Sequence, residues 1–418
     1  MVFRKAILIL LITTLNGWCA HSFAQRHEIL SEGIQSLQVI ANGKWLSSMP
    51  VMDLSNGYVD ISFDDMTHEY HRYTYKLEHC EADWRPSEEL FASDYCDGFS
   101  SGNTIDDVQE SLLTNVLYTH YSLQIPNEKC RIKMSGNYKL TVCDEDNDDT
   151  PVLTACFMVV EPLMGLGLSV TTNTDIDINN SHQQVSMELA YSTISVTNHQ
   201  EQIKTVVLQN GRWDNACWNP SPQYIMPDRL RWDHNKNLIF DAGNEYRKFE
   251  ILSTDVASMG IDKIRWDGEE YHAYPYLSQP RPNYIYDEDA NGAFLIRNSD
   301  NVDSDFTSDY MSVHFQLQCP ERLKDDVYVN GNWTCDRFLP QYRLTYNDDT
   351  KTYETVVRLK LGYYSYQYVT LDAEGKVHIC PTEGSFYQTE NKYQALAYYR
   401  APGGRTDLLV GYQEISTR

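Results

Sequence analysis

The sequence is poor in positive charge. It holds 34 Lys and Arg against 59 Asp and Glu, which gives a formal net charge of −25 at pH 7. Nucleic acids and anionic membrane surfaces carry the same sign and repel such a protein. The composition therefore argues against a nucleic-acid partner. Beyond the first 24 residues no stretch is long and apolar enough to cross a bilayer, so membrane insertion is not expected either.

Cysteine is also sparse. There are ten cysteines in 418 residues, and none forms a C-x-x-C pair. A disulfide scaffold would be shorter and denser in cysteine, and a structural zinc site would need closer ligand spacing. We expect most of these cysteines to be buried core residues, with one or two disulfides allowed in an oxidising compartment and their pairing left open.

The one long apolar run lies at the N-terminus. Arg4 and Lys5 precede the apolar residues 6–15, and Ser22-Phe23-Ala24 supplies small residues before Gln25. This pattern predicts a secretory signal peptide over residues 1–24, cleaved after Ala24. Trp18 precedes Cys19, where a lipoprotein would carry a small residue, so we expect an exported protein without a lipid anchor.

Long amphipathic helices are missing as well. Apolar and polar residues instead alternate with a period of two, which is typical of strands with one buried face. The clearest alternating segments are 58–63, 70–77, 137–142, 203–209, 310–317 and 355–361. Short strands separated by turn clusters predict an all-β protein built of consecutive antiparallel immunoglobulin-like β-sandwich domains.

Turn clusters and polar runs suggest where these domains divide. Glu161-Pro162 closes the first unit, because proline cannot continue a central strand. A polar run over 298–308 is the next candidate linker. We therefore expect domains at 25–162, 163–300 and 301–418.

Three local motifs resemble catalytic or metal sites, and each lacks a part that the chemistry needs. Residues 98–102 match G-x-S-x-G, but loop-like residues flank Ser100 where a nucleophile elbow needs a strand and a helix. Residues 287–292 match the start of a calcium loop, but the closing position holds Asn298. The run 68–71 spaces its histidines three apart, whereas a zinc helix needs four. The sequence therefore predicts a non-enzymatic protein with no catalytic, cofactor-binding or metal-binding residues.

The most unusual stretch is rich in tyrosine. Residues 358–368 read RLKLGYYSYQY, and V-x-G-x-W ends at Trp333 upstream. This combination resembles the early-set immunoglobulin-like modules that flank or bind polysaccharides, in which exposed rings stack on sugars. Trp333 and Tyr363 are the candidate partner- or ligand-facing aromatics. By the period of two, Tyr364, Tyr366 and Tyr368 share a face that we expect to be buried, with Tyr363 on the accessible face.

A second resemblance covers almost the whole chain beyond residue 24. A series of motifs follows the order seen in the type IX secretion system plug family of Bacteroidetes. They are Phe63-Asp64-Asp65, HCEADW at 79–84, Gly98-Phe99, YTHYSLQIPN at 118–127, SGNY at 135–138, LQNGRWDNA at 208–216, GNEYRKFE at 243–250, DYMSVHFQL at 309–317, LKLGYYSYQY at 359–368 and YYR at 398–400.

This second resemblance implies a function without chemistry. It implies a periplasmic protein that binds and seals the periplasmic opening of the outer-membrane translocon barrel of the type IX secretion system. Such a plug needs no cofactor, and its partner is that barrel. The alternative is a carbohydrate-binding β-sandwich module of the periplasm or cell surface, which rests on Trp333 and the tyrosine hairpin. A buried tyrosine face would count against the alternative.

Overall fold

The fold is almost entirely β. The computed structural model describes residues 27–417, so the expected signal peptide at residues 1–24 lies outside the described residues. Within that range the chain forms a succession of mainly antiparallel sheets, with parallel pairs of strands only between β3 and β12 and between β22 and β24, which confirms the predicted all-β class. The α-helices are single turns: α1 (Ala92–Tyr95), α2 (His199–Gln202) and α3 (Ser304–Thr307). No helix between residues 27 and 417 has the length and apolar character of a membrane span.

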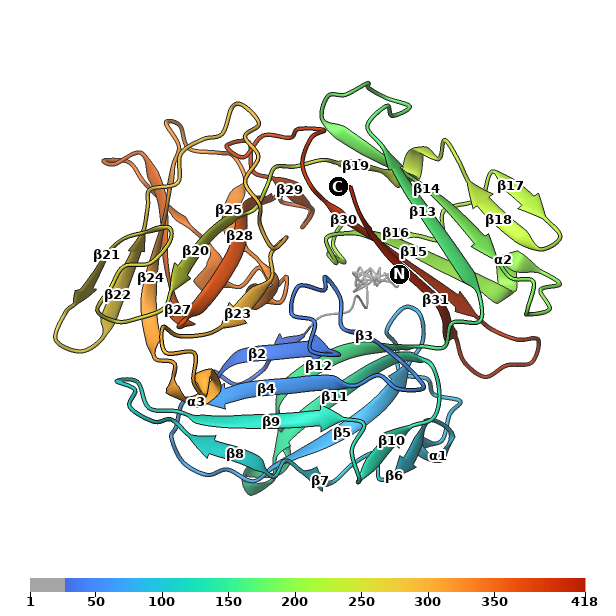
Figure 1. Cartoon of the computed structure of the whole chain (residues 1–418), viewed down its shortest axis with the longest axis horizontal. Helices are drawn as coiled ribbons and strands as arrows, with labels where there is room; N and C mark the ends of the chain where they lie inside the picture. Colours follow the sequence, from blue (N-terminus) through green and yellow to red (C-terminus); the bar gives the residue numbers. More distant parts are fainter. Residues whose placement is uncertain (1–26, 418) are drawn as a thin grey trace, which may run out of the picture.

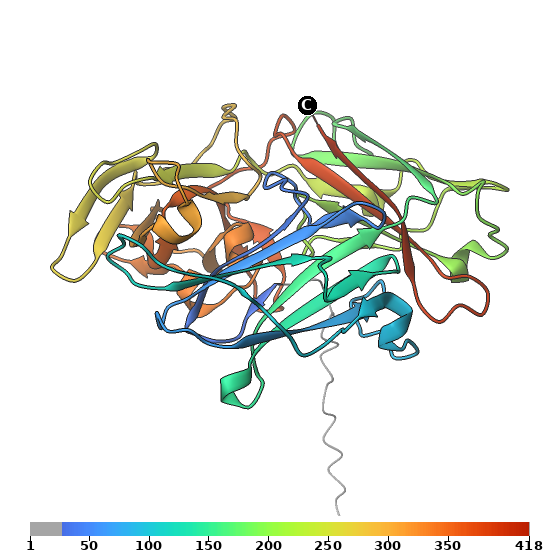
Figure 2. The ribbon, with the colours of Figure 1, turned by 60° about the horizontal axis from the view of Figure 1, so that its bottom comes forward.

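Three β-sandwich domains surround a common centre. Figure 1 shows the blue and cyan first domain below, the green middle domain at the upper right and the yellow and orange third domain at the upper left. Figure 2 shows the same three bodies side by side after the molecule is turned. Four clusters of buried apolar residues correspond to this arrangement: one inside each domain, and a fourth between the first and middle domains.

The first domain packs a six-stranded sheet on a four-stranded sheet. Their core-facing positions alternate along the strands, as the period of two predicted. The larger sheet contains β1 (Glu28–Ile29), β3 (Val51–Asp53), β5 (Tyr73–Cys80), β7 (Asn103–Thr104), β11 (Gly136–Asp144) and β12 (Thr150–Val160); the smaller contains β2 (Ile34–Ala41), β4 (Val59–Asp65), β8 (Asp107–Glu110) and β9 (Thr119–Ile125). A two-stranded ribbon of β6 (Cys96–Gly98) and β10 (Cys130–Ile132) lies at the edge, and the 3₁₀ turn η1 (Glu145–Asn147) joins β11 to β12.

The middle domain is completed by the end of the chain. Its first sheet contains β13 (Gly165–Thr171), β14 (His182–Ala190), β17 (Tyr224–Met226), β18 (Arg229–Trp232) and β19 (Ile239–Asp241), with η2 (Lys236–Leu238) before β19. Its second sheet contains β15 (Ile203–Gln209), β16 (Cys217–Trp218), β30 (Lys392–Tyr399) and β31 (Leu408–Ser416). β15 pairs with β30 along its whole length, from Ile203 opposite Tyr399 to Gln209 opposite Tyr393. The red hairpin of Figure 1 therefore belongs with the green domain.

The third domain lies between the two parts of the middle domain in sequence. One sheet is organised by the long strand β28 (Gly362–Leu371), which pairs with β20 (Arg247–Ile251), β23 (Phe294–Ile296), β25 (Asp326–Asn330) and β29 (Val377–Ile379). The facing sheet contains β21 (Ile261–Trp266), β22 (Tyr271–Pro275), β24 (Tyr310–Gln318), β26 (Thr345–Asn347) and β27 (Thr352–Lys360). The turns η3 (Asn332–Thr334) and η4 (Pro340–Tyr342) connect β25 to β26.

The core clusters divide the chain differently from the expected boundary near residue 300. Phe249 and Ile296, expected in the middle domain, pack in the same cluster as Met311 and Tyr368. Residues 392–416, expected in the C-terminal domain, complete the core of the middle domain. The reason is that β20 and β23 pair with β28, whereas β30 pairs with β15. The polar run at 298–308 is thus a connection inside the third domain.

Candidate functional site

The tyrosine-rich strand is part of the core. Tyr364, Tyr366 and Tyr368 are 2%, 4% and 0% exposed, as the period of two predicted. The ring of Tyr364 stacks on Phe249, with ring centroids 5.5 Å apart. The hydroxyls still find partners, since Tyr364 donates to the carbonyl of Lys360 at 2.6 Å. Buried rings of this kind stabilise the sandwich and leave no aromatic platform for a sugar.

Trp333 corrects an expectation, because it is buried and does not face a ligand. Its side chain is 8% exposed, and its ring lies between Phe315, which it stacks on at 5.8 Å, and Tyr342. The indole Nε1 donates to the carbonyl of Ser365 at 3.2 Å. The turn η3 folds the tryptophan back over the core of its own domain, which sequence spacing alone did not reveal.

Tyr363 lies on the other face of β28 but is only half-buried, and its neighbour comes from another domain. Its ring meets Trp45 of the first domain edge-on, with centroids 6.0 Å apart. Burial raises the pKa of Tyr363, and the charges of Asp289 and Asp287 add to the rise. Trp333 and Tyr363 therefore form no shared site: one is core, and the other is part of a contact between domains.

The carboxylates of the calcium-like motif are already engaged within the protein. Asp289 accepts backbone N–H groups from Tyr246 and Asn291, and Asp287 pairs with Lys248 at 2.6 Å. Asn298, at the position of the closing acid, donates to Thr307 at 2.8 Å. Among residues 27–417 no group of three or more His, Cys, Asp or Glu side chains is arranged to hold a metal ion.

The other motifs are also placed in ordinary structural positions. Ser100 lies in a bend between β6 and β7, without a helix after it. In the run 68–71, His68 bonds the carbonyl of Tyr118 at 3.1 Å, and the backbone N–H of His71 donates to the Tyr121 hydroxyl. His79 is buried and bonds Ser87 at 2.8 Å, and burial lowers its pKa to about 4.

The polar groups that the sequence reading missed lie at the contacts between domains. The first of these contacts, which we call the Asp64 lock, joins the first and third domains through Asp64, His120, Tyr310 and Lys360. The Lys360 ammonium lies 2.5 Å from the Asp64 carboxylate, and both side chains are about 1% exposed. Asp64 also binds His120 at 2.7 Å and accepts from the Tyr310 hydroxyl at 2.6 Å.

The buried charges of the Asp64 lock are stable only when they are paired with each other. Burial alone would raise the pKa of Asp64, but the charge of Lys360 and the hydrogen bond from His120 outweigh it, and the pKa is lowered. The Lys360 ammonium also lies over the Tyr118 ring, 4.1 Å from its centroid. A charge withdrawn from water in this way is tolerated only while its partners stay in place. The lock therefore ties the first domain to the third in one relative position.

Two neighbouring contacts reinforce this junction. The backbone N–H groups of Asn115 and Val116, in the first domain, donate to the Asp309 carboxylate at 2.8 and 3.0 Å. Arg337 of the third domain pairs with Glu28 of the first at 2.7 Å.

A second ionic contact, the Asp407 lock, joins the first and middle domains. Asp407, in the middle domain, pairs with Lys204 and Arg400 of the same domain at 2.7 and 2.9 Å, and Arg400 also pairs across the boundary with Glu81 of the first domain. Asp407 in turn accepts the backbone N–H of Ala82, and its own N–H donates to Glu81. Burial would raise the pKa of Asp407, but the hydrogen bond and charge of Lys204 lower it.

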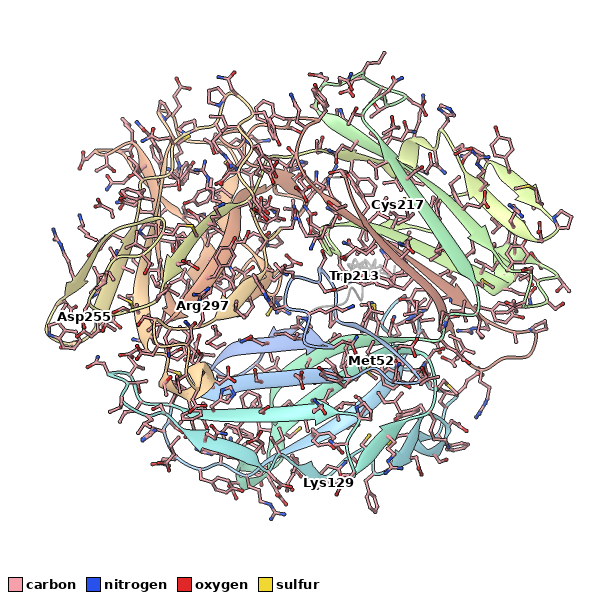
Figure 3. All side chains as sticks on the ribbon, viewed as in Figure 1. Met52, Lys129, Trp213, Cys217, Asp255 and Arg297 are labelled. Carbon is pink, nitrogen blue, oxygen red and sulfur yellow. The ribbon has the colours of Figure 1, made fainter. Side chains whose placement is uncertain are left out.

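An apolar cluster lies beside the Asp407 lock. The rings of Trp84, from the first domain, and Trp213, from the middle domain, meet edge to face at 5.8 Å. Met158 and Leu396 belong to the same buried cluster. Figure 3 labels Trp213 near the centre of the molecule and Met52 in the adjoining part of the first domain. The first and middle domains thus share one core across their boundary.

A loop of the first domain, residues 42–50, reaches both other domains. Figure 1 shows it in blue between β2 and β3, at the common centre. Its Trp45 meets Tyr363, and its Leu46 carbonyl accepts from Lys392 at 2.6 Å. At Gly211, where φ is +68°, an added Cβ would lie 2.2 Å from the Ser48 carbonyl oxygen, so only glycine allows this approach.

Comparisons with known proteins agree with this architecture. A family model described as the type 9 secretion system plug protein first domain matches residues 34–161. A solved structure of a hypothetical protein from Parabacteroides merdae shares 38% identity, with a TM-score of 0.90 over 94% of this chain and 99% of that chain. The chain belongs to the type 9 secretion system plug protein family.

Two further comparisons add nothing to the assignment. Dimeric latent PorU from Porphyromonas gingivalis overlaps with 14% identity and a TM-score of 0.16, over 56% of this chain and 19% of that chain, which is too poor to support an argument. No curated protein matches the sequence.

In this plug-family chain, the motifs that carried the resemblance supply the contacts between domains. Phe63-Asp64-Asp65 contributes Asp64, DYMSVHFQL contributes Asp309 and Tyr310, and LKLGYYSYQY contributes Lys360. HCEADW contributes Glu81 and Trp84, and YYR contributes Arg400. The sequence therefore did contain a signal for these contacts, namely charged residues within strands that are otherwise apolar. These motifs specify how the three domains fit together.

Proposed function

We propose that this protein is a non-enzymatic periplasmic plug that binds the periplasmic opening of the type IX secretion translocon barrel and seals it. The observation that carries the proposal is membership of the plug family, supported by a match over the first domain and by a relative similar along nearly its whole length. The expected signal peptide and the net charge of −25, which disfavours nucleic-acid and membrane partners, are consistent with it.

The domain junctions supply the mechanical part of the proposal. A protein that closes a pore by its shape must resist the relative movement of its parts. Here the buried Asp64 lock, the partly exposed Asp407 lock, a shared apolar cluster and the 42–50 loop connect the first domain to both others. Because the buried Asp64 carboxylate loses Lys360 if the first and third domains separate, opening of this junction is costly. A rigid three-domain body is the shape that such a plug requires.

The carbohydrate-binding alternative loses its basis. It rested on Trp333 and the tyrosine hairpin as an exposed aromatic platform. Trp333 and the Tyr364 face are buried, and Tyr363 meets Trp45. No observation favours sugar binding over the plug.

The decisive experiment is an affinity purification from the native host. The tagged protein would be expressed at its normal level and recovered from detergent-solubilised outer membranes, with an unrelated periplasmic protein carrying the same tag as control. We expect a very large β-barrel protein to be recovered with the tagged chain only, and its recovery to fall when cargo transport is active. Recovery without any barrel, together with retention on polysaccharide gels, would overturn the proposal.

A further inference from the structure

The sulfur atoms of two cysteines lie unusually close at the edge of the first domain. Cys96 opens β6, and Cys130 opens β10 in the two-stranded ribbon. In the antiparallel register Cys96 lies opposite Ile132, and Cys130 lies opposite Gly98, so the two cysteines are diagonal neighbours. Their Sγ atoms are 2.9 Å apart, and the side chains are 3% and 0% exposed. Two cysteines this close need only a small movement of their side chains to form a disulfide.

We propose that Cys96 and Cys130 form an intramolecular disulfide once the chain reaches an oxidising compartment. The oxidant is a disulfide-bonded protein or small molecule that reacts by thiol–disulfide exchange. One thiolate attacks a sulfur of the oxidant to give a mixed disulfide, and the second thiolate then displaces it. The Sγ–Sγ bond forms, two S–H bonds are lost, and two electrons and two protons pass to the oxidant, which leaves as two thiols.

Other cysteines in the described part of the chain are engaged differently. The Cys319 thiol donates to the carbonyl of Glu321 at 2.9 Å, and the Cys380 thiol lies 3.1 Å from the Thr382 hydroxyl. Cys143 lies on β11, and Cys217 lies on β16. The close approach of the Cys96 and Cys130 sulfur atoms thus assigns a pairing that sequence spacing left open.

The cross-link would join the two strands of a short ribbon at the edge of the first domain. The ribbon contains only three residues per strand, and the chain between the two cysteines carries β7, β8 and β9. The backbone N–H of Phe99 donates to the Lys129 carbonyl at the end of the ribbon, and Figure 3 shows Lys129 at the outer rim of the molecule. Closing this loop restricts the unfolded chain, so the bond stabilises the domain.

The test uses the purified full-length mature protein and needs no barrel, so it stands apart from the proposed plug function. The reduced protein is unfolded in denaturant and refolded with oxidised glutathione, so that the oxidant reaches both cysteines, and is then denatured again, alkylated and weighed by mass spectrometry. We expect two thiols to be protected and one peptide pair linking Cys96 to Cys130, which disappears on reduction. In the control Cys319→Ser, the same cross-link should form.

Two variants test whether the bond involves both Cys96 and Cys130 and whether it stabilises the protein. Cys96→Ser should leave Cys130 open to alkylation, and the double variant with Cys130→Ser should melt at the same temperature with and without reductant. The oxidised wild-type protein should melt roughly 5 °C above its reduced form. Alkylation of both Cys96 and Cys130 after oxidation, or a cross-link that joins either to a different cysteine, would overturn the proposal.

Discussion

At the residue scale, the contact that matters most for the shape of the molecule is the Asp64 lock. Replacing Lys360 with methionine keeps the length and apolar stem of the side chain but leaves the Asp64 carboxylate buried without its main counter-charge. Breaking one partner of a buried ion pair costs about 3 kcal/mol or more. We expect Lys360→Met to lower the free energy of unfolding by about that amount in urea titrations.

Two further variants give this prediction its control and its limit. Lys351→Met removes a lysine whose side chain is exposed beside Asp348, and it should change the free energy of unfolding by less than about 0.5 kcal/mol. Adding Asp64→Asn to Lys360→Met removes both charges, so the double variant should lose less than the sum of the single losses. A Lys360→Met protein as stable as wild type would mean that the lock does not hold the domains.

Asp289 makes a pH-dependent contribution to the free energy of unfolding. Its pKa is raised, whereas the pKa of Asp64 is lowered. Burial raises the pKa of its carboxyl to about 7, with Glu245 adding to the rise. Because this folded-state pKa lies above the unfolded value near 4, the folded protein holds the extra proton, and the resulting stabilisation is lost as the pH rises through 7. Between pH 5 and pH 8, wild type should lose about 2 kcal/mol of stability relative to Asp289→Asn.

The control for Asp289→Asn is a variant at a carboxylate that is exposed to solvent. Asp287 belongs to the same loop and pairs with Lys248, but its side chain is 62% exposed. Asp287→Asn should therefore track the pH profile of wild type in chemical denaturation measured at both pH values. If Asp289→Asn also tracked wild type, the Asp289 carboxyl would have to be ionised throughout this range.

At the scale of whole elements, the sequence predicted those features of the fold that depend on local patterns of residues. Alternation predicted strands such as 310–317 and placed Tyr364, Tyr366 and Tyr368 on one buried face. It could not show that β30 and β31 return to the middle domain, because pairing between β15 and β30 leaves no mark within either strand. Trp333 was misjudged for the same reason: the turn η3 determines its direction, and the apolar surface that it covers is distant in sequence.

The return of the C-terminal hairpin gives a testable division of the chain. Residues 243–388 contain the whole apolar cluster of the third domain, whereas residues 301–418 lack Phe249, Ile251 and Ile296 and carry β30 and β31 without their partner β15. We expect a fragment of residues 243–388 to fold and to unfold cooperatively by circular dichroism. The fragment 301–418 should aggregate, since it exposes apolar strand faces. Cooperative folding of 301–418 alone would restore the boundary near residue 300.

At the scale of the whole molecule, the plug function proposed above would place the contacts with the barrel on surface loops. A protein with a net charge of −25 gains little by steering toward a neutral or acidic barrel mouth, so shape and aromatic anchors should carry the binding. Among residues 27–417, four aromatic side chains on loops are more than 60% exposed: Tyr70, Phe91, Phe99 and Tyr276. We expect at least one of the four single substitutions to serine to reduce recovery of the barrel about tenfold or more.

Salt and charge variants separate this mechanism from an electrostatic one. Barrel recovery by the wild-type protein should persist in 0.5 M salt, where the Debye length falls below about 5 Å and exposed charge pairs are screened. As a matched control, Lys129→Ser changes an exposed side chain of the same first-domain rim, and it should bind as wild type does. If all four serine variants kept full recovery while salt abolished it, the barrel would be recognised by charge, and the aromatic loops would serve only the fold.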